Sequence, residues 1–235
     1  MHVPLALGRA ADNVPRMEEL MRQIDGYCER TDFTYWSEPI NAVTNAAFII
    51  AALWMWRRTA GLVWARVLCV ILFAIGIGSF LFHTHATLWA ALADTIPIGI
   101  FILVYLFLVH WHVLNLKLWQ AGIAVLLFFP YAAAVVWAAN QNGFFAISNF
   151  YWTVPILLFV YGIGLWRRDL ATAQGFIVGG AILTLSITLR SIDELACDML
   201  PMGTHYWWHL LNGLMLGIMI EVYRRHRLAA GEARG

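Results

Sequence analysis

Three histidines in this sequence have types and spacing suited to binding one metal ion. His205 and His209 are four residues apart, so on a helix both imidazoles lie on one face and can reach the same ion. His83 comes from a distant part of the chain. Three histidines with an open fourth position are typical of catalytic zinc, whereas structural zinc sites usually close that position with another protein ligand. We therefore predict that His83, His205 and His209 bind zinc.

Two further polar residues fit a hydrolytic site around these histidines. Ser79 lies four residues before His83, on the same helical face. A zincin takes its base from a His-Glu-x-x-His motif, but here the segment from His205 to His209 reads His-Tyr-Trp-Trp-His and has no glutamate. The base must then come from elsewhere, and Asp94 is the candidate. We expect Ser79 to hydrogen-bond the attacking water or the developing oxyanion.

The remaining histidines are weaker candidates for metal ligands. A single histidine within a membrane is more often part of the packing than a ligand, so the site rests on the convergence of several polar residues. His85 is an alternative ligand to His83. It is six residues after Ser79, however, so it does not lie on the helical face that His83 shares with Ser79. Three further histidines lie among basic residues on the opposite side and receive no role. These are His110, His112 and His226.

The composition places these residues in a membrane protein. Of 235 residues, 61% are hydrophobic and 12% are charged, whereas a soluble domain is about half apolar and about a quarter charged. The net charge of +1 and the absence of a basic patch exclude nucleic acid as a partner. Residues 1–38 lack an apolar run with a small-residue cleavage site, so we expect no removable signal peptide.

Seven apolar runs are long enough to cross a bilayer, which predicts an all-α bundle of seven transmembrane helices. They lie near 39–56, 65–83, 88–110, 118–138, 149–166, 172–190 and 204–223. The first is expected to start with Ser37 as its cap and Pro39 in its first turn. The bundle then spans 39–223, after an acidic segment at 1–38 and before a basic tail at 224–235.

The basic residues predict the orientation. They fall in connections on one side of the predicted bundle, and the positive-inside rule makes that side cytoplasmic. These residues are Arg57, Arg58, Arg66, Lys117, Arg167, Arg168, Arg224, Arg225 and Arg227. The N-terminus is then outside and the C-terminus inside. All five candidate site residues belong to the outer ends of their helices, so we expect a multi-pass membrane protein whose site faces the outer side.

Three blocks of this sequence resemble the alkaline ceramidases, which belong to a superfamily of seven-helix hydrolases that includes the adiponectin and progestin receptors. The first runs from Tyr27-Cys28-Glu29 to Glu38-Pro39-Ile40-Asn41, with Asn45. The second is Gly78-Ser79-Phe80-Leu81-Phe82-His83 with Asp94. The third is Ile192-Asp193 with Cys197 and the segment from His205 to His209. The receptors are less similar, because they lack the acidic N-terminal block.

The resemblance implies an activity and a substrate class. In the alkaline ceramidases three histidines bind zinc, an aspartate and a serine complete the site, and ceramide is hydrolysed at its amide to a sphingoid base and a fatty acid. The matching residues here are His83, His205 and His209 with Asp94 and Ser79. A lipid amide suits a site at a membrane-embedded helix end, because its acyl chain can stay among apolar side chains in the bilayer.

The resemblance also implies a calcium site and a disulfide. The family builds its calcium site from the N-terminal acidic segment, which here offers Asp25, Glu29, Asp32 and Glu38, with Thr31 as an alternative to Asp32. A solvated acidic segment is the competing interpretation. The family bridge corresponds to Cys28–Cys197, and both cysteines fall in outward-facing segments where a disulfide persists. Cys69, within a span, is expected to be a small buried hydrophobe.

Two other functions remain open from the sequence. A receptor-like seven-helix protein could bind a lipid without turnover and use zinc structurally. A haem-binding electron-transfer bundle could use histidines from facing helices, although it would leave Asp94 and Ser79 without a role.

Overall fold

The protein was analysed as a computed structural model that describes residues 17–231. Apart from one isolated bridge between Gln23 and Thr87, the regular structure in this range is helical. The predicted N-terminal segment 1–38 is thus described from Met17, and the predicted tail 224–235 as far as Gly231. Residues 1–16 and 232–235 lie outside the described part.

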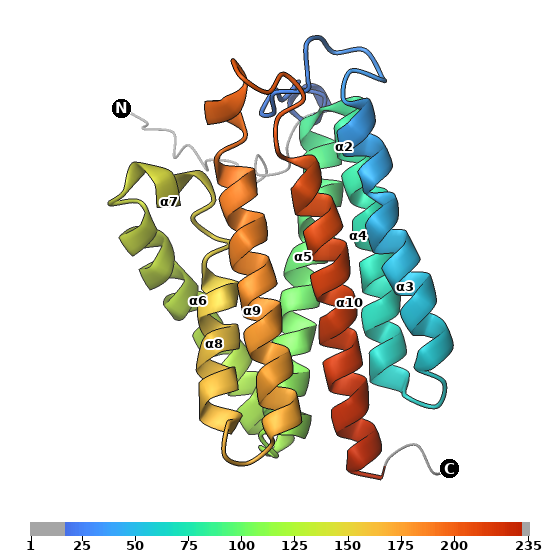
Figure 1. The fold of residues 1–235 in the computed structure, drawn as a ribbon, viewed down its shortest axis with the longest axis vertical. Helices are drawn as coiled ribbons and strands as arrows, with labels where there is room; N and C mark the ends of the chain where they lie inside the picture. The colour runs from blue at the N-terminus through green and yellow to red at the C-terminus, as the bar shows by residue number, and fades with distance from the viewer. Residues whose placement is uncertain (1–16, 232–235) are drawn as a thin grey trace, which may run out of the picture.

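The long helices pack side by side in one bundle (Figure 1). They are α2 (Pro39–Thr44) and α3 (Ala46–Arg58), α4 (Val63–His85), α5 (Leu88–Leu108) with the π-helical turn η1 (Val109–Val113), α6 (Leu118–Ala139), α8 (Thr153–Leu165), α9 (Leu170–Ser191) and α10 (Tyr206–Ala229). Three short helices lie in connections: α1 (Met17–Leu20), α7 (Gly143–Ile147) and η2 (Glu194–Ala196).

Five stretches among the described residues are helical, long and apolar enough to cross a membrane. They are Pro39–Arg58, Val63–His85, Leu88–Val113, Leu118–Ala139 and Leu170–Ser191. The chain is therefore a multi-pass membrane protein. The other two predicted spans are also helical, but α8 has only 13 residues and α10 carries charged side chains such as Glu221 and Arg224 in its second half. The count of seven spans and the orientation of the termini stay predictions.

The start of the first span differs from the prediction. Ser37 does not cap it, because its hydroxyl accepts the backbone N–H groups of Thr31 and Asp32, each at 3.1 Å. The residue at the cap position is Glu38, whose side chain makes no capping hydrogen bond, and Pro39 opens the helix as expected. A serine hydroxyl is equally suited to accept amides of a preceding turn, and the sequence does not separate the two uses.

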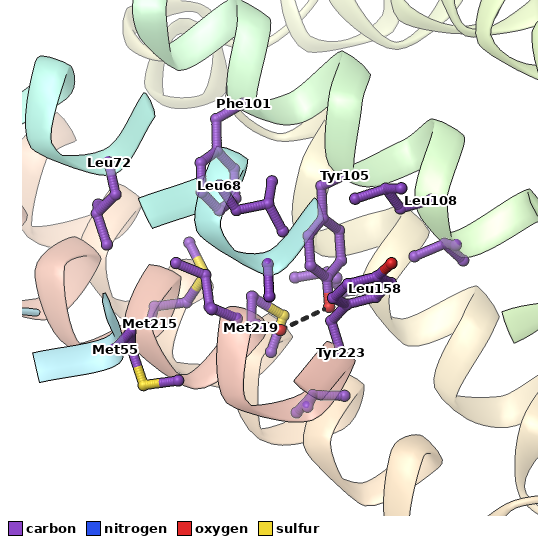
Figure 2. Close-up of a cluster of buried hydrophobic side chains, with 14 of the residues drawn as sticks. Met55, Leu68, Leu72, Phe101, Tyr105, Leu108, Leu158, Met215, Met219 and Tyr223 are labelled. Carbon is purple, nitrogen blue, oxygen red and sulfur yellow. Dashed lines mark hydrogen bonds between the residues drawn. The ribbon is translucent and has the colours of Figure 1, made fainter. Parts of the chain in front are cut away.

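Buried apolar side chains fix the helices against one another toward the end of the bundle where α10 ends (Figure 2). Leu68 of α4, Leu108 of α5 and Leu158 of α8 meet there with Met219 of α10. The Tyr105 hydroxyl of α5 donates a hydrogen bond to the carbonyl oxygen of Met219 at 3.0 Å. This packing holds α4, α5 and α10, which bear the candidate site residues at their opposite ends.

Near that opposite end, α4 and α5 approach each other closely at Gly78. A Cβ added to Gly78 would lie 2.7 Å from the carbonyl carbon of Ala93, and closer still to its oxygen. The contact therefore requires glycine. Since Ser79 follows Gly78 and Asp94 follows Ala93, the same contact brings these two polar residues together.

Gly78→Ala is expected to destabilise the protein by about 1–3 kcal/mol, because the added methyl group meets backbone that cannot move independently. It should also displace Ser79 from Asp94 and lower activity. Thermal unfolding in detergent measures the first effect. Gly99→Ala in α5 is the matched control, because its Cβ would have no neighbour within 4 Å. Equal unfolding temperatures for the two variants would contradict the proposed contact.

Candidate metal centre

Three buried histidines converge at one end of the bundle. His83 lies in the last turn of α4, His205 directly precedes α10, and His209 lies in its first turn. The exposed fractions of the three residues are 1%, 2% and 0%. One ring nitrogen from each lies within 4.8 Å of the others. The structure thus brings together the three histidines predicted from the sequence, in an arrangement that could hold a metal ion.

Each of these imidazoles has a buried nitrogen without a hydrogen-bond partner among residues 17–231. The atoms are Nε2 of His83, Nδ1 of His205 and Nε2 of His209. Buried polar atoms are almost always paired, so three unpaired ones in a single cluster need an explanation. A metal ion supplies one, since neutral imidazole is a common ligand of zinc and other transition metals. The residues present therefore fit a metal site.

Neighbouring side chains indicate which nitrogen is available in two of the three rings, those of His83 and His209. Nδ1 of His83 lies 2.6 Å from Oε2 of Glu38, and an ionised carboxylate can only accept, so the proton of His83 is on Nδ1. The Thr44 hydroxyl donates to the carbonyl oxygen of Ile40 and lies 2.8 Å from Nδ1 of His209. Its oxygen therefore accepts from His209. In both rings Nε2 keeps its lone pair, as a metal ligand requires.

The start of α10 is held by Asp193, which is 1% exposed. Its Oδ1 accepts the backbone N–H groups of Thr204 and His205, and its Oδ2 accepts that of Cys28 at 3.0 Å. One carboxylate thus joins the N-terminal segment to the residues that lead into α10. The sequence analysis gave Asp193 no role. The available signal was an acidic residue in a block that matches the family.

The predicted Cys28–Cys197 disulfide is present and links residues 169 positions apart. It lies beside the Asp193 contacts, so a covalent bond and a buried carboxylate fix the same junction. Figure 1 shows the two loops concerned, in blue and in orange, at one end of the bundle. Cys69 is free and buried, as expected.

The two other predicted site residues lie beside the histidines. Ser79 is 2% exposed and precedes His83 by one helical turn on α4. The Asp94 carboxylate on α5 lies near the Ser79 side chain, and it interacts electrostatically with His83. A carboxylate, a hydroxyl and three imidazoles are therefore grouped in one buried region.

Arg190 is a residue of this region that sequence reasoning missed. Its guanidinium lies over the rings of Tyr27, Tyr151 and Trp208, at 5.9, 5.3 and 5.6 Å from their centroids. Its Nη1 donates to the Ser148 hydroxyl at 2.8 Å. Tyr27 also stacks on His205, with 3.6 Å between ring centroids. Arg190 therefore places a permanent positive charge near the histidines. An arginine at the end of an apolar run was the only sequence signal.

Among residues 17–231, the four acidic residues predicted as calcium ligands do not include three whose carboxylates lie at metal-binding distance of one another. Glu29 accepts the backbone N–H groups of Ile40 and Asn41 at 2.7 and 2.8 Å. Asp32 is exposed and accepts from Thr34, whose hydroxyl and amide hold the pKa of this carboxyl below its usual range. Glu38 bonds to His83, and Asp25 is exposed.

Within residues 17–231, the three histidines are the only group of three or more metal-ligating side chains at binding distance. The competing histidine, His85, is exposed and packs against Tyr35 and Trp89. The preference for His83 therefore agrees with the geometry. His110 and His112 lie in η1, at the other end of the bundle, where His226 also lies.

A family model described as Ceramidase matches residues 24–233. The chain belongs to the ceramidase family. The resemblance found in three sequence blocks is thereby confirmed over most of the chain, and membership makes the protein a hydrolase that acts on ceramide. No curated protein matches the chain. The buried histidine cluster is the part of this ceramidase that suits a metal-dependent reaction.

Asp193→Asn is expected to destabilise this ceramidase by about 1–3 kcal/mol, because the amide nitrogen of asparagine cannot accept the N–H group of Cys28 or of the α10 start. A lower unfolding temperature and a lower metal content of the purified protein would both show that these hydrogen bonds have been lost. Glu194→Gln is the matched control, since Glu194 is an exposed neighbour. If both substitutions behave alike, Asp193 does not hold the start of α10.

Proposed function

We propose that this ceramidase is a zinc-dependent amidohydrolase, with His83, His205 and His209 as the metal ligands. The observation that supports this most directly is the convergence of three buried imidazole nitrogens that have no protein partner. The three ligands come from two helices that the bundle core holds in place. Zinc in such a site supplies Lewis acidity, which lowers the pKa of a coordinated water toward about 7 and polarises the scissile carbonyl.

Asp94 is the general base of the proposed reaction. It takes a proton from the attacking water, whose oxygen forms a bond to the amide carbon. The carbon–nitrogen bond then breaks, and Asp94 returns the proton to the departing amine, which leaves as the sphingoid base. The fatty acid is the second product. A carboxylate that moves one proton in this way typically contributes about 10²–10⁴-fold to the rate.

Ser79 and Arg190 have supporting roles in the proposal. The Ser79 hydroxyl neighbours Asp94 and orients the carboxylate or donates to the developing oxyanion. Arg190 interacts with Asp94 electrostatically, and a nearby cation favours the ionised form that a base needs. In the proposal, Ser79 thus aligns the Asp94 carboxylate, and the positive charge of Arg190 opposes the effect of burial on it.

An apolar cavity between the helices supports a lipid substrate. Phe48, Phe101, Tyr151, Trp208 and Met215 are among its lining residues. The cavity lies next to the histidine cluster, because its lining residue Phe48 packs edge-on against the ring of His209, with 6.2 Å between centroids. An acyl or sphingoid chain in this cavity would place the amide among the polar residues. The predicted topology puts this end of the bundle on the outer side of the membrane.

The proposal is tested by separating metal binding from proton transfer. His209→Ala should lose both bound zinc and ceramide hydrolysis, because it removes a ligand. Asp94→Asn should retain zinc and lower kcat by about 10²–10⁴-fold, because it removes the base. Metal analysis and mass spectrometry of the products measure the two effects.

His85→Ala is the control, because His85 is exposed and outside the cluster, and it should retain zinc and turnover. Purified protein without stoichiometric zinc, or full activity in His209→Ala, would overturn the proposal. Lipid binding without product would favour the receptor-like function. A Soret band in the purified protein would favour the haem protein.

A further inference from the structure

Arg30 is a buried cation beside the metal centre. Its side chain is 1% exposed, and each of its three guanidinium nitrogens donates to an oxygen. Nε donates to Oε1 of Glu38, Nη1 to the carbonyl oxygen of Asp32 at 2.9 Å, and Nη2 to the carbonyl oxygen of His83 at 3.0 Å. The three acceptors come from separate parts of the chain. The guanidinium therefore joins the N-terminal segment, the start of α2 and the last turn of α4.

The acceptors around Arg30 are of the kind that calcium prefers. Calcium binds carboxylate and carbonyl oxygens, and it needs about six to eight of them. Here one carboxylate and two carbonyl oxygens are already bound to a positive charge. The second oxygen of Glu38 bonds to Nδ1 of His83 and Nδ2 of Asn41. Both oxygens of Glu38 are thus already engaged by protein donors, and one of these donors carries a permanent positive charge.

We propose that Arg30 takes the place of the calcium ion that the family resemblance implies, and that this ceramidase works without calcium. The guanidinium is the fixed cation of the N-terminal segment. It neutralises Glu38, which would otherwise be an uncompensated buried charge. A calcium ion at the same oxygens would meet a permanent like charge at bonding distance, so the two cations exclude each other.

Arg30 is also a positioning residue for His83. Its Nη2 holds the His83 carbonyl, while its Nε holds the carboxylate that accepts from the His83 ring. The backbone and the imidazole of one proposed ligand are thus fixed by a single side chain. Outer-sphere partners of metal ligands typically affect metal affinity by about 10–100-fold. This role depends on the proposed zinc site, whereas the replacement of calcium does not.

Calcium titration of the wild-type protein tests the replacement directly. Calcium is added up to about 1 mM, the weak end of the range for extracellular calcium modules, and is removed with EGTA in a parallel sample. Isothermal calorimetry should then show no heat of binding. The unfolding temperature should be the same with calcium and with EGTA. Saturable binding of one calcium, or a lower unfolding temperature in EGTA that calcium restores, would overturn the proposal. Neither measurement requires hydrolysis, so its outcome is separate from that of the proposed function.

The positioning role is tested with Arg30→Ala and Arg30→Lys. Both should bind zinc about 10–100-fold more weakly than the wild type, because lysine cannot reach three acceptors in separate directions. Added guanidinium ion should restore part of the zinc affinity of Arg30→Ala. Arg22→Ala is the control, since Arg22 is exposed in the same segment, and its affinity should be unchanged.

If Arg30→Ala does not fold, Arg30→Lys keeps the charge and provides the same comparison. Wild-type zinc affinity in a folded Arg30 variant would show that Arg30 does not position His83. A wild-type protein that binds zinc but does not hydrolyse ceramide would instead contradict the proposed function. The proposal that Arg30 replaces calcium would not be affected by that result.

Discussion

The Glu38 carboxylate between His83 and Arg30 is the interaction on which the site depends. A charged group in an apolar bundle is costly unless each of its oxygens is paired. Glu38 meets this requirement with a guanidinium on one oxygen and an imidazole and an amide on the other. The pairing orients the ring of His83 and ties α4 to α2. The polar end of the bundle is built around this contact.

Elsewhere at this end, backbone amides are paired with the carboxylates of the buried Asp193 and the partly buried Glu29. Asp193 accepts amides at the start of α10, and Glu29 accepts amides at the start of α2. Negative charge at a helix N-terminus is favourable, because the first amides of a helix lack partners within it. The three imidazole nitrogens are conspicuous because so many of the surrounding polar groups are satisfied.

The sequence predicted the parts of the site that follow from local spacing. His205 and His209 share a helical face, and Ser79 and His83 share another, because the period of a helix fixes both. The pairing of Cys28 with Cys197 required the family resemblance. Seven helical ranges could be read from long apolar runs, whereas the use of Ser37 by a preceding turn could not.

The positions of Arg30, Asp193 and Arg190 were not accessible in this way. Each has at least one partner more than 40 residues away along the chain, as Arg30 has in His83, 53 residues away. The residue type alone predicts a solvated charge for an arginine or an aspartate. Glu38 shows the same limit, because its residue type does not reveal that an arginine and a histidine are its partners.

The Cys28–Cys197 bridge and the position of His205 and His209 have a consequence for biosynthesis. The N-terminal segment and His83 are made early, but His205 and His209 lie at the start of the last helix of the bundle. A chain released before residue 197 lacks these two histidines and also Cys197, the partner of Cys28. The histidine cluster is therefore assembled only when α10 has been synthesised, and an unfinished ceramidase chain enters the membrane without it.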